Sequence, residues 1–106
     1  MDTDASPGES DRRSAFLVER YLPASAAVDL GDAVAAVERA CAERRSRGQA
    51  ITYLQSMYLP TEDMCFCVFE APSSDAVRAV NEAAAFRLDR ITEAVVMTPS
   101  PPRSFT

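Results

Sequence analysis

The chain has 106 residues, which is enough for one domain with one hydrophobic core. Hydrophobic residues make up 47% of the sequence and charged residues 25%, as is typical of a globular protein. The 11 basic residues, all arginine, are outnumbered by 16 acidic ones, and the net charge is −5. Nucleic acids and anionic lipid surfaces would repel such a molecule, so we expect neither as a partner.

The sequence also bears on where the protein resides. No apolar run approaches the roughly 20 residues that a membrane-spanning helix needs, and residues 1–14 contain no apolar segment typical of a signal peptide. Cys41, Cys65 and Cys67 are odd in number, which argues against a disulfide framework. We therefore expect a cytoplasmic protein without membrane contact, in a compartment that keeps thiols reduced.

Composition divides the chain into a domain and two tails. Residues 1–14 are polar and acidic, and we interpret them as a flexible N-terminal tail. Residues 98–106 contain three prolines, which fit neither a sheet ladder nor a helix interior, so they form a predicted C-terminal tail. The predicted domain is then 15–97.

Hydrophobic periodicity predicts the elements of this domain. In chain order they are a strand at 16–22, a helix at 25–47, strands at 51–59 and 64–70, a helix opening at 73, and a strand at 91–97. Ser25 and Ser73 are candidate N-caps of the two helices, and Gly48 is placed to end the first. The order β-α-β-β-α-β predicts a ferredoxin-like α+β fold, a four-stranded antiparallel sheet with both helices on one face.

The alternation of side chains along each strand assigns residues to the two sheet faces. The predicted helix-covered face comprises Phe16, Val18, Leu54, Cys65, Cys67, Phe69, Ala94 and Val96. The opposite face comprises Leu17, Glu19, Tyr21, Ile51, Tyr53, Gln55, Met57, Phe66, Val68, Glu70, Ile91, Glu93 and Val95. Because this second face is rich in large apolar groups, something must cover it. We expect a homodimer, sheet against sheet, that encloses a barrel-like space for a small-molecule ligand.

Three carboxylates are candidate acid–base groups of that space: Glu19, Glu70 and Glu93. Burial raises the pKa of a carboxyl group, which suits it to general acid or base catalysis. The alternative is architectural, with Glu19 paired to Arg20 or Arg90 at the dimer rim.

The other predicted ligand-binding residues are Tyr21, Tyr53, Gln55, Met57 and Phe66. The two phenols could donate hydrogen bonds to an oxyanion, or they could be packed rings whose hydroxyls reach solvent.

The cysteines permit a further alternative. Cys65 and Cys67 share one strand face and Cys41 lies on the apolar stripe of the first helix, so the three thiols could form a soft-metal site or simply be core residues. No other metal site is predicted. The chain has no histidine, which excludes Ser-His and Cys-His hydrolytic machinery, and its three glycines are too scattered for a phosphate loop.

Three stretches carry a family resemblance: FLVERYLP at 16–23, CFCVFEAPS at 65–73 and DRITEAV at 89–95. They resemble the blocks of a family of small bacterial proteins of unknown function, typified by a nickel-responsive, nickel-binding protein. The resemblance implies a ferredoxin-like fold and a dimeric α/β barrel, an architecture shared with cofactor-free monooxygenases and small-molecule cyclases. Nickel sites rely on imidazole, so the metal function does not transfer residue by residue to a chain without histidine.

Two functions remain open from the sequence. The first is a dimeric barrel that binds a small ligand or a metal and acts as a sensor, carrier or buffer. The second is a cofactor-independent cyclase or isomerase that uses the cavity carboxylates. We predict no cofactor, and nickel enters only through the resemblance.

Overall fold

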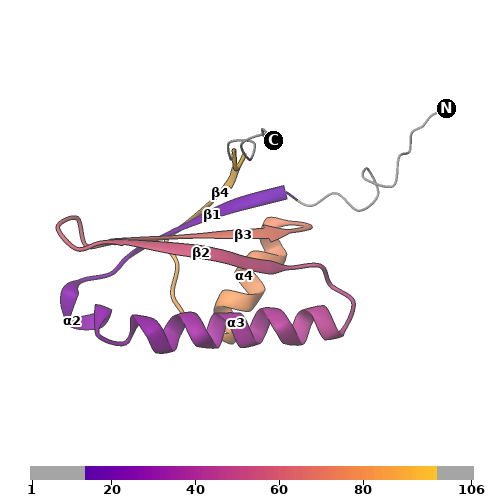
Figure 1. The fold of residues 1–106 in the computed structure, drawn as a ribbon, viewed down its shortest axis with the longest axis horizontal. Coiled ribbons are helices and arrows are strands. Elements are labelled where there is room, and N and C mark those ends of the chain that lie inside the picture. The colour runs from indigo at the N-terminus through magenta and orange to yellow at the C-terminus, as the bar shows by residue number, and fades with distance from the viewer. Residues whose placement is uncertain (1–13, 98–106) are drawn as a thin grey trace, which may run out of the picture.

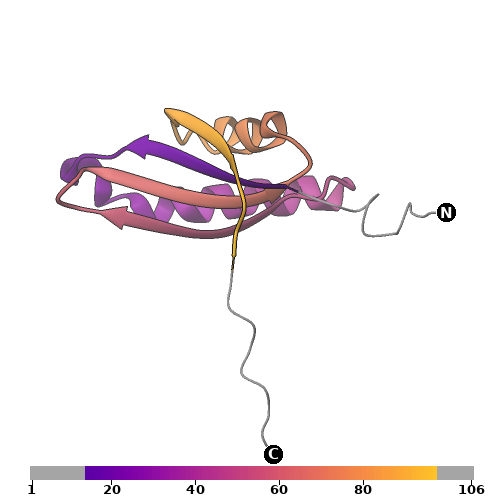
Figure 2. The same ribbon diagram turned by 90° about the horizontal axis from the view of Figure 1, so that it is seen from above.

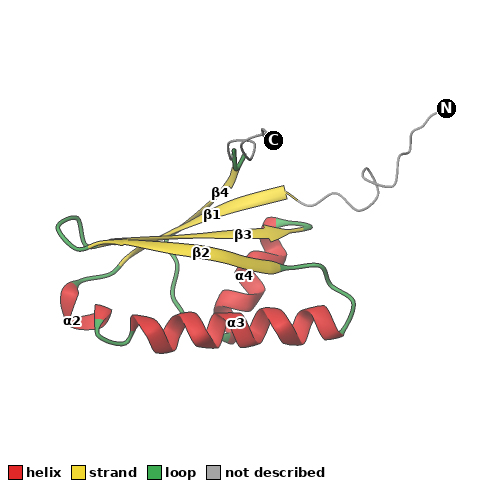
Figure 3. Cartoon of the chain, in the orientation of Figure 1, coloured by secondary structure: helices red, strands yellow, loops and turns green. Residues whose placement is uncertain are grey.

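A computed structural model describes residues 14–97, so the predicted tail residues 1–13 and 98–106 lie outside the described part. Its elements are β1 (Ser14–Tyr21), α2 (Ala24–Ala27), α3 (Leu30–Ser46), β2 (Thr52–Leu59), β3 (Met64–Ala71), α4 (Ser74–Ala83) and β4 (Arg90–Ala94). The strands form one antiparallel sheet in the order β2-β3-β1-β4. The helices lie on one side of this sheet, and its other side carries none (Figures 1 and 3).

This arrangement confirms the predicted α+β fold with its split β-α-β topology. The first and third strands of the chain occupy the centre of the sheet, and the second and fourth form its edges, as the view from above shows (Figure 2). No helix within residues 14–97 has the length and apolar character needed to cross a membrane.

The core lies between the sheet and the two longer helices. Alternate residues of β3, from Cys65 to Ala71, are buried there, as the period of a strand requires. Val37 and Cys41 come from α3, and Val77 and Val80 come from α4. Spacings of three and four place each pair on one helix face, and this sets both helices against the sheet.

The helix predicted at 25–47 is divided in two. A short α2 follows Pro23, and α3 begins after Asp29, so Ser25 is not an N-cap. Proline suits the start of a helix because it has no N–H group to leave unpaired. Asp29 occupies the N-cap position of α3 without a side-chain capping bond. The predicted ends are confirmed elsewhere: Gly48, at φ 91°, follows α3, and Ser73 caps α4 by accepting a 3.2 Å hydrogen bond from the amide of Ala76.

The last strand is shorter than predicted. It ends at Ala94 instead of reaching residue 97, and the chain then leaves the sheet on the side without helices (Figures 1 and 2). Val95, Val96 and Met97 are 82%, 51% and 82% exposed, so the predicted placement of Val96 in the core is wrong.

The assignment of faces also needs correction in β2 and β4. A bulge between Tyr53 and Gln55 inserts Leu54 as an extra residue, which reverses the alternation on its N-terminal side. Tyr53 therefore pairs with the buried Phe69 on the helix-covered face, while Leu54 is exposed. Ile51, just before β2, is fully buried.

In β4, Ile91 pairs with Val18 and Glu93 pairs with Phe16, and both partners are core residues. Directly paired residues of antiparallel strands lie on one face, so Ile91 and Glu93 belong to the helix-covered side. The sequence-based assignment is off by one residue in this strand.

Candidate functional site

The helix-free face of the sheet, called the open face below, carries most of the predicted site residues. They are Glu19, Tyr21, Gln55, Met57, Phe66 and Glu70. Around them lie the large apolar side chains of Leu17 and Val68, which pair with each other across β1 and β3. Tyr21 is 54% and Met57 56% exposed in the single chain. The open face therefore combines apolar bulk with a few polar groups, as ligand sites commonly do.

The two carboxylates of the open face lie apart from each other. Glu19 is opposite Phe66, whereas Glu70 is opposite Ala15, four residues away along β1. At about 3.4 Å per residue this offset is roughly 14 Å. Glu19 lies instead 3.7 Å from the guanidinium of Arg90, as one of the two sequence alternatives predicts. One chain therefore holds two separate carboxylates here and no carboxylate pair.

Glu93 takes a different position. It lies at the sheet edge and borders a surface hollow of about 460 Å³ together with Glu70, close to Ser14 and Ala15. Glu19 is absent from this hollow. The three predicted acid–base residues are therefore not gathered in one place in a single chain.

Tyr53 points into the core. Its ring packs 5.5 Å from that of Phe69, its hydroxyl makes a short hydrogen bond with Ser56, and Ser56 Oγ lies 2.8 Å from Cys67 Sγ. Burial is the main cause that raises the pKa of Tyr53. Of the two readings that the sequence allows for this phenol, the structure favours the packed ring.

The thiols are buried as well. The sulfur atoms of Cys65 and Cys67 are 4.0 Å apart on β3, and Cys41 lies on α3 in the same core. Burial raises the pKa of Cys41 to about 11, and burial together with the neighbouring Cys67 does the same for Cys65. Both groups are therefore protonated thiols at neutral pH.

The donor set for a metal is incomplete. Within the described part of the chain, no three His, Cys, Asp or Glu side chains gather where they could hold a metal ion. The three-thiolate site that the sequence leaves open as an alternative to core cysteines is not formed, because among the described residues only Cys65 and Cys67 come together. Since the sequence also has no histidine, the described residues of a single chain do not fit a nickel ion.

The core contains a buried positive charge, the side chain of Arg20, which is not among the site residues predicted from the sequence. Arg20 is only 1% exposed. One Nη of its guanidinium donates to the backbone carbonyls of Phe86 and Arg87, and the other lies 2.9 Å from Asn81 Oδ1 and 3.2 Å from Cys67 Sγ. Its Cζ lies 3.5 Å from the centroid of the Phe86 ring, a cation–π contact. No carboxylate of residues 14–97 forms an ion pair with it.

The alternation of side chains along β1 is enough to predict that Arg20 is buried. Phe16 and Val18 point to the helix-covered side, and the period of two places Arg20 there as well. The sequence suggested for Arg20 only a role as one of two alternative rim partners of Glu19. Asn81 carries no comparable pattern, because a polar residue within the apolar stripe of α4 is recognised only once its partner is known.

Comparison with known proteins decides the family. The model of the SCO4226-like family, described as nickel responsive protein SCO4226-like, matches residues 16–94. The chain belongs to this family. The family likeness that the three sequence stretches indicate is thereby confirmed.

A solved structure supports the fold of this SCO4226-like protein. The crystal structure of SCO4226 from Streptomyces coelicolor A3(2) matches with a TM-score of 0.64 and 21% sequence identity, over 80% of this chain and all of that one. At this identity the likeness concerns the fold alone. A search of curated proteins found no significant match.

Proposed function

We propose that this protein is a small-ligand-binding homodimer in which the open faces of two sheets enclose the ligand. The observation that carries the proposal is the composition of the open face, where Leu17, Phe66 and Val68 lie together on the side without helices. Apolar side chains in a contiguous patch of this kind mark binding or association surfaces.

The segment that follows β4 supports a second copy as the cover. Val95, Val96 and Met97 leave the sheet on its open side, and all three are exposed. Packing against the open face of a partner would bury them. Three strands of eight residues and one of five, about 4.8 Å apart, give each sheet a face of roughly 470 Å² in projection. Side chains that project from the face make its accessible area larger than this projection, which brings it toward the ~800 Å² that each partner contributes to a standard interface.

The polar groups of the open face define the ligand class. Glu19 and Glu70 supply negative charge, Gln55 and Tyr21 supply hydrogen bonds, and two copies would present each group twice. The enclosed space therefore suits an organic molecule with an apolar body and cationic or hydrogen-bond-donating groups. The family description names a nickel response, and a nickel ion here would need carboxylate donors from both copies.

Native mass spectrometry of gently purified, untagged protein tests the proposal. A dimer that carries an organic mass supports it. A dimer that carries nickel changes the ligand class to the metal, and a bare dimer contradicts tight binding. A monomer at micromolar concentration contradicts the enclosed site itself.

Two substitutions test the carboxylates, with a matched control. Glu19→Gln and Glu70→Gln each remove one charge from the open face, so the fraction of dimer with bound ligand mass should fall. Glu62→Gln changes an exposed carboxylate in the turn between β2 and β3 and should leave that fraction unchanged. If all three variants carry bound ligand mass in the same fraction of dimer, the two carboxylates do not contribute to binding.

A further inference from the structure

The buried charge of Arg20 is the starting point for a second site, on the helix side of the sheet. A guanidinium does not lose its proton in a protein, and burying a charge is costly unless an opposite charge compensates it. Among residues 14–97, the groups that contact Arg20 are carbonyl oxygens, an amide, a thiol and an aromatic ring, and its buried Nε–H has no partner there. Within the described residues, this cation therefore lacks an anion.

A cavity adjoins this cation. It has a volume of about 440 Å³ and lies between the end of β1, the start of α3 and the loop that leads to β4. Its apolar lining comes from Leu22, Pro23, Ala26, Leu30, Ala33 and Phe86. Arg20 forms part of the wall, and the exposed residues Tyr21 and Asp29 lie at the rim.

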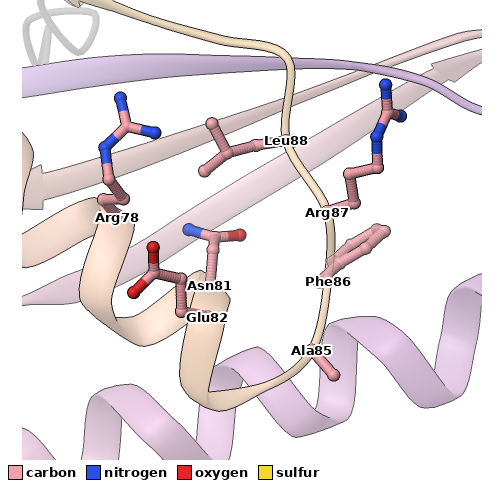
Figure 4. A pocket seen from close by; sticks show the side chains of 7 residues that line it. All are labelled: Arg78, Asn81, Glu82, Ala85, Phe86, Arg87 and Leu88. Atoms are coloured by element: carbon pink, nitrogen blue, oxygen red, sulfur yellow. The ribbon is translucent and has the colours of Figure 1, made fainter.

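The position of Phe86 gives the cavity an aromatic wall. In Figure 4 the ring projects from the loop on the side away from α4, whereas Asn81 lies between α4 and the loop. Phe86 and Asn81 both line a neighbouring hollow of about 330 Å³. The ring stacks on the Arg20 guanidinium, so the loop fixes the direction of the cation as well as one side of the cavity.

We propose that this cavity binds a small organic carboxylate, with its carboxylate group at Arg20 and its apolar tail along the α3 wall. Guanidinium groups are the preferred protein partners of carboxylates, and the buried Nε–H of Arg20 has no hydrogen-bond partner among the described residues. The backbone N–H groups at the start of α3 add partial positive charge, which the Asp29 carboxylate at the rim partly offsets. Arg87, also in the lining, is already paired with Asp89.

Isothermal titration with octanoate and octanamide tests the proposal on the full chain. The two probes share one tail and differ in charge, so octanoate should bind and octanamide should bind at least tenfold more weakly. Acetate, which has the charge without the tail, should also bind more weakly than octanoate, since each buried methylene favours binding. Equal affinity for octanoate and octanamide, or no binding of octanoate, would overturn the proposal.

Substitutions then test whether octanoate binds in the cavity beside Arg20. Arg20→Met should weaken octanoate binding at least tenfold through loss of the charged hydrogen bond. Ala33→Leu fills the cavity and should do the same, whereas Ala35→Leu, on the exposed side of α3, should not. Asp29→Asn removes the negative charge at the rim and should tighten binding about two- to fivefold.

These variants also cover the case in which Arg20→Met fails to fold. If Ala33→Leu binds octanoate as wild type does, or if Asp29→Asn weakens binding, the cavity is not the site. The inference does not depend on the dimer, because Arg20 and the apolar lining lie on the helix-covered side of the sheet and not on the open face. Loss of dimerisation by an open-face variant with octanoate affinity retained would separate the two sites.

Discussion

Burial determines the chemistry of the cysteine side chains. Cys41 and Cys65 are fully buried, and the absence of water around a thiolate raises both pKa values to about 11. Because the thiolate is the reactive form, these residues should be inert in the folded protein.

Thiol titration with Ellman's reagent at pH 8 measures this directly. Cys41 and Cys65 should react at least tenfold more slowly in the native protein than in denaturant, where every cysteine of the chain should react at the rate of a free thiol. Fast reaction of Cys41 or Cys65 in the native state would contradict their burial.

The same pKa values predict how stability depends on pH. Between pH 9, the ordinary thiol value, and pH 11, the unfolded chain loses these protons while the folded chain retains them. The free energy of unfolding should therefore fall by about 1.4 kcal/mol per pH unit for each thiol in this range, and the thiols should have no effect below pH 9. Urea denaturation across the range checks the slope, and Cys41→Ala should show a shallower fall than wild type. An identical slope in the variant would remove Cys41 as a contributor.

At the residue scale, prediction from sequence depended on whether alternation was unbroken. Glu19 and Glu70 lie on strands without irregularity, and their face was predicted correctly. Tyr53 was misplaced because the bulge at Leu54 is a backbone feature that composition does not reveal. The burial of Arg20 follows from the unbroken alternation of β1, but its partners, Asn81 and the Phe86 loop, are more than 60 residues away along the chain and were not predictable.

At the element scale, local chemistry decides where helices start and stop. Ser73 has extended backbone angles and its hydroxyl accepts from the Ala76 amide, which satisfies one of the unpaired N–H groups of α4. The prediction from sequence succeeded here because a cap is a property of neighbouring residues. It failed at 25–47, where no proline or glycine lies between Ser25 and Asp29 to mark the break.

Ser73→Ala should lower the free energy of unfolding by about 1 kcal/mol, since the capping hydrogen bond is lost. Ser74→Ala is the matched control: the neighbouring serine is the first residue of α4, is exposed and makes no capping bond, so its removal should have little effect. Chemical denaturation of both variants provides the comparison, and equal losses would show that Ser73 does not act as a cap.

At the scale of the whole molecule, the fold leaves one sheet face without helices. The order of elements was predictable because each strand and helix has a clear period and the connections are short. The occupant of the open face was not, because what covers a surface depends on a second molecule and not on the pattern of one chain.

Val68→Glu places a carboxylate at the centre of the open face, on β3 and opposite Leu17. A charge buried there without a partner is costly, so this variant should weaken self-association at least tenfold and leave the fold intact. Ala42→Glu, on the exposed surface of α3, adds the same charge and should leave association unchanged. Far-ultraviolet circular dichroism checks the fold of both variants.

The most direct test of the enclosed ligand site is the molar mass of the untagged wild-type protein in solution. Sedimentation equilibrium at micromolar concentration should give twice the mass of one chain. The mass of a single chain under these conditions would show that the open face stays uncovered and that no ligand space is enclosed between two sheets.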